Sequence, residues 1–300
     1  MFKFSWKRLG IAAGLSFTLF AAGCTSGGNE TEDDNKGTSS VDDGQELELA
    51  YVEWDTEIAS THVIGKVLED LGYDISLTPL DNAVMWEAVA NGEADAMVAA
   101  WLPGTHAAQF EEYGDKMIDL GANLEGASIG LVVPAYMDVN SIEDLADHAD
   151  KVITGIEPGA GVVAASERAL KDYPNLKDWE VQTSSSGAMA TSLGQAYENE
   201  EEIVVTGWSP HWKFQKYELK YLEDPKGTFG EAEEIHTMAR QGLEEDMSEA
   251  YKVLDNFNWT PEEMEEVMLA IQDGENPEDA AAAWVKANPD RVKEWTKGIE

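Results

Sequence analysis

The sequence predicts an α/β fold made of two related lobes. Segments with strand and helix character alternate along most of the chain, which is typical of lobes built on mainly parallel sheets. Two stretches, 49–60 and 151–162, each combine a strand, an acidic loop and a small-residue helix start. About fifty residues after each one comes a strand that ends in Trp-x-Pro, at 97–103 and 204–210. This internal similarity suggests two lobes whose loops meet at the carboxyl ends of their strands, where ligands bind in open α/β sheets.

In the first half, apolar strand-like segments are separated by segments with the apolar spacing of helices. Ser60 or Thr61 suits the start of the first helix, and Gly72 and Gly92 suit the two helix ends. The expected order is strand 47–54, helix 60–72, strand 74–80, helix 82–92 and strand 94–101.

The second half repeats this alternation and ends in a helical tail. Ser141 and Asp144 suit the start of a short helix. The expected order is strand 128–134, helix 141–150, strand 151–156, helix 161–173, strand 179–185, helix 186–200 and strand 202–208. Residues 244–300 are helical in pattern, with breaks near Pro261, Pro277 and Pro289.

The N-terminal segment predicts export and anchoring. Three cations precede the short apolar stretch 9–22, so residues 1–23 have the pattern of a signal peptide. Cys24 is the only cysteine and directly follows Ala-Ala-Gly, which resembles a bacterial lipobox and implies that lipid is attached to its thiol. Residues 24–46 then form an acidic, polar segment that we expect to be a flexible tether.

The charge of the chain excludes one class of partner. The formal net charge is −39, whereas binding to a phosphate backbone requires a basic face, so we expect no nucleic-acid partner.

HExxH, CxxC and Walker motifs are absent from the sequence, and we predict a binding protein without catalytic residues, metal or cofactor rather than an enzyme. A surface adhesin or structural lipoprotein is a third class, but neither needs paired tryptophans at strand ends.

Three tryptophans lie at predicted strand ends: Trp54, Trp101 and Trp208. A quaternary ammonium has no N–H to donate, but the negative faces of aromatic rings attract it. Three indole faces from two lobes therefore suit such a cation, although packing or sugar stacking would explain any one of them. Trp212 is a rival to Trp208, and Trp86 lies within a helix pattern and is expected in the core.

A second element of the sequence suits an anion. In the segment TGIEPGAGV, Gly155 and Ile156 lead from a strand into a helix, and glycine-rich backbone at a helix start can donate N–H groups to a carboxylate. His106, five residues after Trp101, could donate a further hydrogen bond. Together with the tryptophans, these groups favour a zwitterionic ligand.

Several long motifs carry a family resemblance. YVEWDTEIAS, AAWLPGTH, ITGIEPGAGV, VTGWSPHW, KYLEDPKGTFGEAEEIHT and NWTPEEMEEVM, and nearly all of the chain from about Leu47 onward, resemble the OpuAC-type glycine betaine-binding lipoproteins of osmoprotectant ABC importers. The resemblance implies a two-lobed periplasmic-binding-protein fold (type II), with the ligand in the cleft between lobes. It also implies a lipid-anchored protein on the outer face of the cell membrane that delivers glycine betaine, often proline betaine too, to permease and ATPase subunits; choline or carnitine is the alternative ligand.

The resemblance also assigns residues and lobes. It implies a cage of Trp54, Trp101 and Trp208 around the trimethylammonium group, with the carboxylate held by the amides of Gly155 and Ile156 and by His106. In one branch of the family the Gly-Ile half precedes the YVxWD half, and here the order is reversed. The expected lobes are 47–136 for the first and 137–232 for the second, with the helical segment 233–300 packed on the first.

Overall fold

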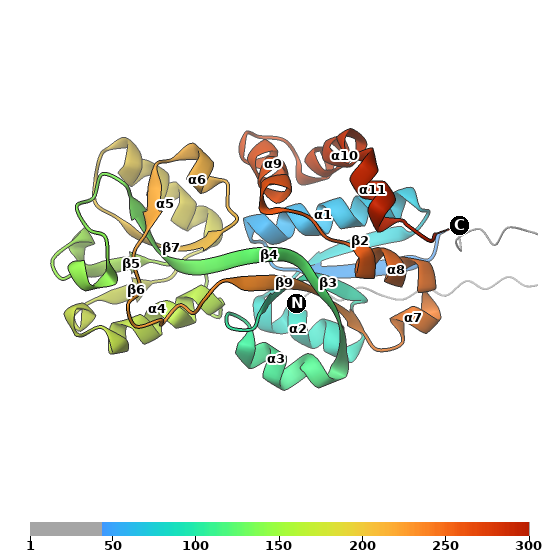
Figure 1. Ribbon diagram of the computed structural model, residues 1–300, viewed down its shortest axis with the longest axis horizontal. Coiled ribbons are helices and arrows are strands. Elements are labelled where there is room, and N and C mark those ends of the chain that lie inside the picture. The colour runs from blue at the N-terminus through green and yellow to red at the C-terminus, as the bar shows by residue number, and fades with distance from the viewer. Residues whose placement is uncertain (1–43, 300) are drawn as a thin grey trace, which may run out of the picture. The chain divides into compact units, whose positions relative to one another are not determined.

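Nine strands form one curled sheet at the centre of residues 44–299, the part of the chain that this computed structural model describes. The strands are β1 (Glu46–Tyr51), β2 (Asp74–Pro79), β3 (Ala96–Leu102), β4 (Met117–Pro134), β5 (Val152–Thr154), β6 (Glu180–Gln182), β7 (Val204–Ser209), β8 (Leu219–Tyr221) and β9 (Glu233–Arg240). Their order is β2-β1-β3-β9-β4-β7-β5-β6, and β8 pairs with β4. The long strand β4 therefore connects two groups of strands (Figure 1).

The pairing is parallel at both ends of the sheet and antiparallel in its middle. β1 lies parallel to β2 and β3, and β5 lies parallel to β6 and β7. β9 and β4 run antiparallel to each of their partners. The expectation of mainly parallel sheets is thus correct for the outer strands only, because β9 and the first part of β4 were not predicted as strands.

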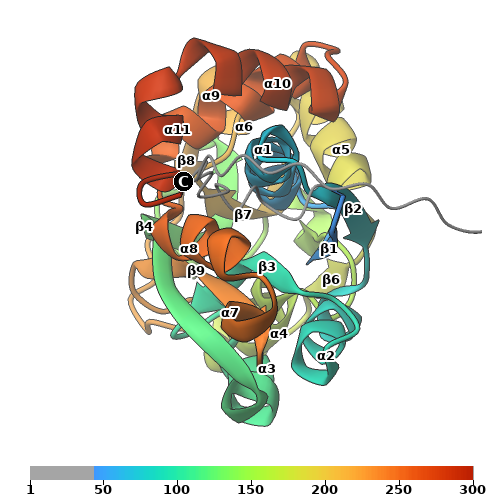
Figure 2. The same cartoon turned by 90° about the vertical axis from the view of Figure 1, so that its right-hand side faces the viewer.

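Helices cover both faces of each group of strands. In the first group, α1 (Asp55–Asp70), α9 (Pro261–Gln272) and α10 (Pro277–Ala287) lie on one face, and α2 (Asn82–Asn91) and α3 (Ala107–Tyr113) lie on the other (Figures 1 and 2). The second group carries α4 (Gly161–Asp172), α5 (Ser186–Glu198) and α6 (Lys213–Lys216), and the tail adds α7 (Leu243–Asp246), α8 (Ser248–Asn256) and α11 (Pro289–Trp295). Short 3₁₀ turns occur at Gly114–Lys116, Ile142–Asp144, Ala149–Lys151 and Pro174–Leu176.

The start of α1 differs from the expectation and matters for the site. The helix begins at Asp55, with Trp54 as its N-cap, and the predicted caps Ser60 and Thr61 are buried within it. Asp55 and Glu57 lie in its first turn, where acidic side chains interact favourably with the helix dipole. The helix therefore starts at the residue that directly follows the first of the three tryptophans.

Other predicted boundaries are confirmed. Gly92 ends α2 with φ 72°, in the left-handed region that glycine adopts without steric cost. Pro261, Pro277 and Pro289 each stand in the first turn of a tail helix, where a missing N–H costs nothing. The expected helix at 141–150 forms two 3₁₀ turns instead, although Ser141 and Asp144 do make a capping box.

The predicted signal peptide, the lipidated Cys24 and nearly all of the tether lie outside the described residues. Within residues 44–299, no helix is both long and apolar enough to cross a membrane.

Candidate functional site

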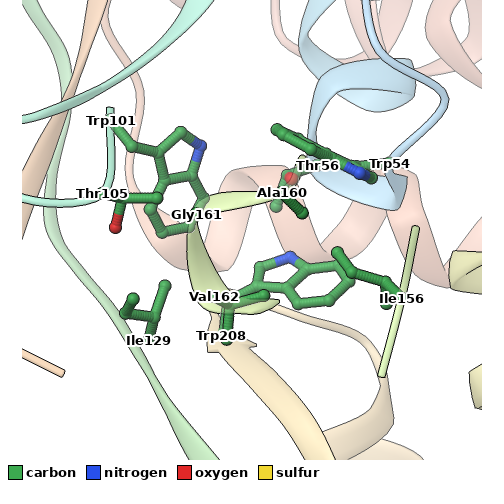
Figure 3. A pocket seen from close by; sticks show the side chains of 10 residues that line it. All are labelled: Trp54, Thr56, Trp101, Thr105, Ile129, Ile156, Ala160, Gly161, Val162 and Trp208. Atoms are coloured by element: carbon green, nitrogen blue, oxygen red, sulfur yellow. The ribbon is translucent and has the colours of Figure 1, made fainter. Parts of the chain in front are cut away.

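The three predicted cage tryptophans line one cavity. Trp54 follows β1, Trp101 lies in β3 and Trp208 lies in β7, so the walls come from both groups of strands. Figure 3 shows the three indoles around a common space. The remaining lining residues are Thr56, Thr105, Ile129, Ile156, Ala160, Gly161 and Val162.

The cavity is narrow, and its indole walls are almost fully buried. Trp54, Trp101 and Trp208 are 6%, 3% and 4% exposed, so the exposed indole faces expected from the sequence are covered by neighbouring residues here. The space between the walls is small, about 30 Å³ as measured by the positions that the centre of a water molecule can take. A group bound there would therefore touch several of the walls at once.

The N–H groups of the cage tryptophans differ in their partners. Trp101 Nε1 donates to Glu57 at 2.8 Å, and Trp54 Nε1 donates to Glu157. Trp208 Nε1 has no hydrogen-bond partner among the described residues. Two indoles are thus held by carboxylates, whereas Trp208 is held by packing.

Trp212, the rival to Trp208, does not line the cavity. Its Nε1 donates to Asp55 at 2.7 Å, and Asp55 also accepts a hydrogen bond from Ser186 at 3.0 Å. Asp55 starts α1, Ser186 starts α5 and Trp212 follows β7. These bonds therefore join the first group of elements to the second beside the cavity. Trp86 is fully buried, which confirms it as a core residue.

Burial and hydrogen bonding shift the pKa of Asp55 in opposite directions. Burial alone would raise this pKa, but hydrogen bonds from His211, Trp212 and Ser186 lower it overall. The carboxylate is therefore ionised at neutral pH and holds its partners as a charged acceptor.

His106 lies behind the cavity wall rather than on it. Its ring is fully buried and stacks on Trp54 with 5.9 Å between the ring centroids. Nδ1 accepts the Trp101 backbone N–H at 3.1 Å, which places the proton of the neutral ring on Nε2. Burial lowers the pKa of His106 to about 3, although the Ala99 backbone acts in the opposite direction and limits this decrease. Nε2 makes no hydrogen bond within residues 44–299, so it is a buried donor without an acceptor.

Of the two backbone amides predicted to hold the carboxylate, only one has an N–H group without an acceptor. The Gly155 N–H donates to Gln182 O at 2.8 Å, at the edge of the sheet. Ile156 lines the cavity, and its N–H finds no acceptor among the residues that the structure describes. The predicted contact of Gly155 with a ligand stays a prediction, and it would require this sheet bond to be given up.

The start of α4 lies directly against the Trp101 loop. A Cβ on Gly161 would meet Thr105 Cγ2 at 2.4 Å, so this close approach requires glycine. Glu233, at the start of β9, accepts hydrogen bonds from the N–H groups of Gly104 and Thr105, each at 2.6 Å. The loop after Trp101 is thus fixed by a carboxylate on a neighbouring strand.

Sequence reasoning did not identify the acidic side chains behind the cage: Asp55, Glu57, Glu157 and Glu233. In a chain with 59 acidic residues, a single carboxylate carries no visible signal, and burial is what distinguishes Glu57 and Glu233. Among residues 44–299, no group of His, Cys, Asp and Glu side chains could hold a metal ion.

Comparison with known proteins identifies the family. The family described as the substrate-binding domain of ABC-type glycine betaine transport systems, OpuAC, matches residues 45–287. The glycine betaine/carnitine transport binding protein GbuC of Listeria monocytogenes is 52% identical over 176 residues, which are 58% of this chain and 57% of that protein. The aligned part thus spans little more than half of this relative's length.

Solved structures share the fold. Lactococcal OpuAC, in a closed conformation with glycine betaine, is 56% identical with a TM-score of 0.83, covering 84% of this chain and all (100%) of its own. An ABC-transporter choline-binding protein with choline is 30% identical with a TM-score of 0.79, covering 85% of this chain and 92% of its own. With the topology above, these similarities confirm the predicted two-lobed α/β fold of periplasmic binding proteins. The chain belongs to the OpuAC family, the substrate-binding domains of ABC-type glycine betaine transport systems.

Proposed function

We propose that this protein is the extracytoplasmic substrate-binding protein of an ABC importer and captures glycine betaine, and also proline betaine, for osmoprotection. The observation that carries the proposal is that three indoles from both groups of strands line one cavity. Each cation–π contact contributes about 0.5–2 kcal/mol when desolvated. Glycine betaine and this cage have matching chemistry, because the trimethylammonium group offers charge and apolar surface but no hydrogen-bond donor.

The carboxylate of the ligand would be held by donors that lack acceptors here. We assign the Ile156 N–H and His106 Nε2–H to this role, together with Gly155 if its bond to Gln182 opens. A buried donor without a partner costs about 1–3 kcal/mol, so supplying an acceptor would favour closure around a carboxylate. The names of the Listeria relative and of the lactococcal complex, both given above, support the same ligand class.

A different quaternary amine is the second candidate, because a choline-binding protein is 30% identical to this chain. Isothermal titration of the purified protein with glycine betaine, proline betaine, carnitine and choline separates the two. We expect the betaines to bind and choline to bind more weakly, because choline has no carboxylate. Tighter binding of choline than of glycine betaine would contradict the assignment. Recovery of unchanged betaine after incubation would further distinguish a binder from an enzyme.

We further propose how the ligand is delivered. Cys24 carries lipid, the acidic segment 24–46 tethers the protein to the membrane, and the lobes 47–136 with 233–300 and 137–232 close around the ligand before docking on the permease. Cys24→Ala should release the protein into the medium of cells that express it. Retention of this variant in the membrane fraction would contradict the anchoring.

A further inference from the structure

Glu57 lies outside the cavity, but each oxygen of its carboxylate contacts a residue that lines it. Oε1 accepts the hydrogen of Trp101 Nε1 at 2.8 Å, and Oε2 accepts the hydroxyl hydrogen of Thr56. The residue is 1% exposed. In Figure 3 the nitrogen-bearing edge of Trp101 is turned toward the side on which Thr56 lies. One buried carboxylate therefore bridges two walls of the cage.

We propose that Glu57 is a positioning residue of the cage, which fixes the Trp101 indole and places a negative charge next to the ring that faces the cation. The inference rests on the proposed function, because it assumes a quaternary ammonium ligand. Rotation of the ring away from this orientation would break its hydrogen bond to the carboxylate. Donation of this N–H to a carboxylate also polarises the indole, which makes its face more attractive to a cation.

A bound cation and the charge on Glu57 must favour each other. A buried carboxylate is costly without partners, and burial raises the pKa of Glu57 to about 7. An opposite charge nearby lowers the pKa of a carboxyl group, so the cation favours the ionised form. By reciprocity, ionisation of Glu57 strengthens binding of the cation. Betaine affinity should therefore rise as pH increases through about 7, and binding below this pH should release a proton.

Asp55 and the two buried histidines of this region do not change charge in the same range. Asp55 is the charged neighbour whose field acts on Glu57, and its own pKa is lowered. Burial lowers the pKa of His106 to about 3, and burial with the charge of Lys213 lowers that of His211 to about 4. Burial also lowers the pKa of Lys213 well below its ordinary value, but this side chain lies over the ring of Trp208. The transition assigned to Glu57 is therefore the one that the Trp101 indole senses and that Glu57→Gln removes.

Glu157 offers a matched control. It accepts the Trp54 Nε1–H as Glu57 accepts that of Trp101, but its side chain is partly exposed. Water screens a charge at such a position. Glu157→Gln should therefore change the pH dependence of betaine binding much less than Glu57→Gln does.

The first experiment needs no ligand. In protein labelled with ¹⁵N at the tryptophan indoles, the Trp101 Nε1–H resonance, assigned with Trp101→Phe, should shift with a midpoint near pH 7. Glu57→Gln keeps an acceptor and the side-chain shape, so the resonance should persist without this transition. The Trp212 indole, which donates to Asp55, a carboxylate with a lowered pKa, is the internal reference. The same transition in the Gln variant would overturn the assignment.

The second experiment measures betaine binding between pH 6 and pH 8.5 in buffers of different ionisation enthalpy. The wild-type protein should bind glycine betaine about tenfold more tightly at the upper end, since a nearby cation lowers a carboxyl pKa by about one unit or more. Binding of glycine betaine to the wild-type protein should also release protons at the lower end of this pH range. Glu57→Gln should lose the pH dependence and the proton release, and Glu57→Leu should bind more weakly than Glu57→Gln because it leaves the indole N–H without an acceptor.

The outcomes separate the two proposals. If the wild-type protein binds no betaine at any pH, the proposed function is wrong. If it binds betaine and Glu57→Gln has the same affinity and proton release across the range, the function stands and the role of Glu57 is wrong.

Discussion

Trp208 differs from the other two cage tryptophans in the partner of its indole N–H. Trp54 and Trp101 each donate their indole N–H to a carboxylate, whereas that of Trp208 has no partner among residues 44–299. Lys213 Nζ lies 4.2 Å from the centroid of its ring, and the Lys213 side chain is fully buried. Trp208 therefore contributes its ring face and its shape rather than a hydrogen bond, and another aromatic ring could replace part of that contribution.

Removing the ring of Trp208 should weaken betaine binding. Trp208→Ala should cost about 0.5–2 kcal/mol for the lost cation–π contact and more for the lost shape, whereas Trp208→Phe should retain part of the affinity. Calorimetric titration of both variants with glycine betaine measures this. Trp179→Phe is the control, because Trp179 is equally buried and does not line the cavity. An affinity of Trp208→Ala equal to that of the wild-type protein would show that the ligand lies elsewhere.

His106 and the cage should have separable effects. His106→Ala removes the Nε2–H donor and should weaken glycine betaine by about 1–3 kcal/mol, because a hydrogen bond to the carboxylate is lost. Binding of choline, which has no carboxylate, should be nearly unchanged. Calorimetric titration of this variant with both ligands measures the difference, and retained binding of choline shows that the variant is folded. Equal losses for the two ligands would mean that His106 does not contact the carboxylate.

At this scale the sequence predicts the aromatic walls but not the groups behind them. Trp54, Trp101 and Trp208 stand at strand ends, and strand order places such ends together. The use of Gly155 in a sheet bond depends on pairing with Gln182, and the role of Glu57 depends on burial. Neither pairing nor burial of one residue follows from local pattern.

Among the elements, the long strand β4 was predicted only in part. Only 128–134 was expected as a strand, whereas β4 begins at Met117 and its first part contains Gly121 and Gly126. In the structure Gly126 has φ 81° and forms a bulge opposite β9, between the pairs Glu125–Glu234 and Ala127–Glu233. The strand continues through this irregularity into the second group of strands. β9, which pairs with β3 and β4 in the sheet, was not expected either.

Gly126→Ala should destabilise the fold through the backbone alone. A Cβ at this position meets no atom within 4 Å, but the positive φ is strained for alanine and costs about 1–2 kcal/mol. Gly187→Ala is the control, because its Cβ also meets no atom within 4 Å and its φ is not positive. Since Gly187 lies in α5, its change to alanine should be neutral or stabilising by up to about 1 kcal/mol. Urea unfolding of both variants measures the difference, and a Gly126→Ala variant as stable as the wild-type protein would show that the bulge carries no strain.

Across the whole molecule, Asp55 holds the closed arrangement together. It belongs to α1, on the first group of strands, and accepts hydrogen bonds from Ser186 and Trp212 of the second group. Since these bonds join the two groups of strands beside the cavity, they would break or lengthen if the lobes part to admit a ligand, and would form again when the lobes close. A ligand that binds the closed state shifts the population toward it.

Weakening this contact should lower affinity without altering the cage. Ser186→Ala removes one hydrogen bond to a charged acceptor and should cost about 1–2 kcal/mol of betaine binding. Ser192→Ala, on the same helix, removes a bond from its hydroxyl to the Ala188 carbonyl four residues earlier and should leave the affinity unchanged. Titration calorimetry with small-angle scattering checks affinity and closure together. Equal affinities for the two variants would argue against a role of Asp55 in closure.

The pairing of Ala127 with Glu233 has a consequence for how such a chain can be rearranged. The polypeptide leaves the first group of strands at Ala127 and returns at Glu233, and these two residues are direct partners across β4 and β9. Everything between them is therefore topologically an insertion into a hairpin. A gene that lost the intervening segment would need only a tight turn to reconnect the strands, and a gene that gained it could do so without disturbing their register.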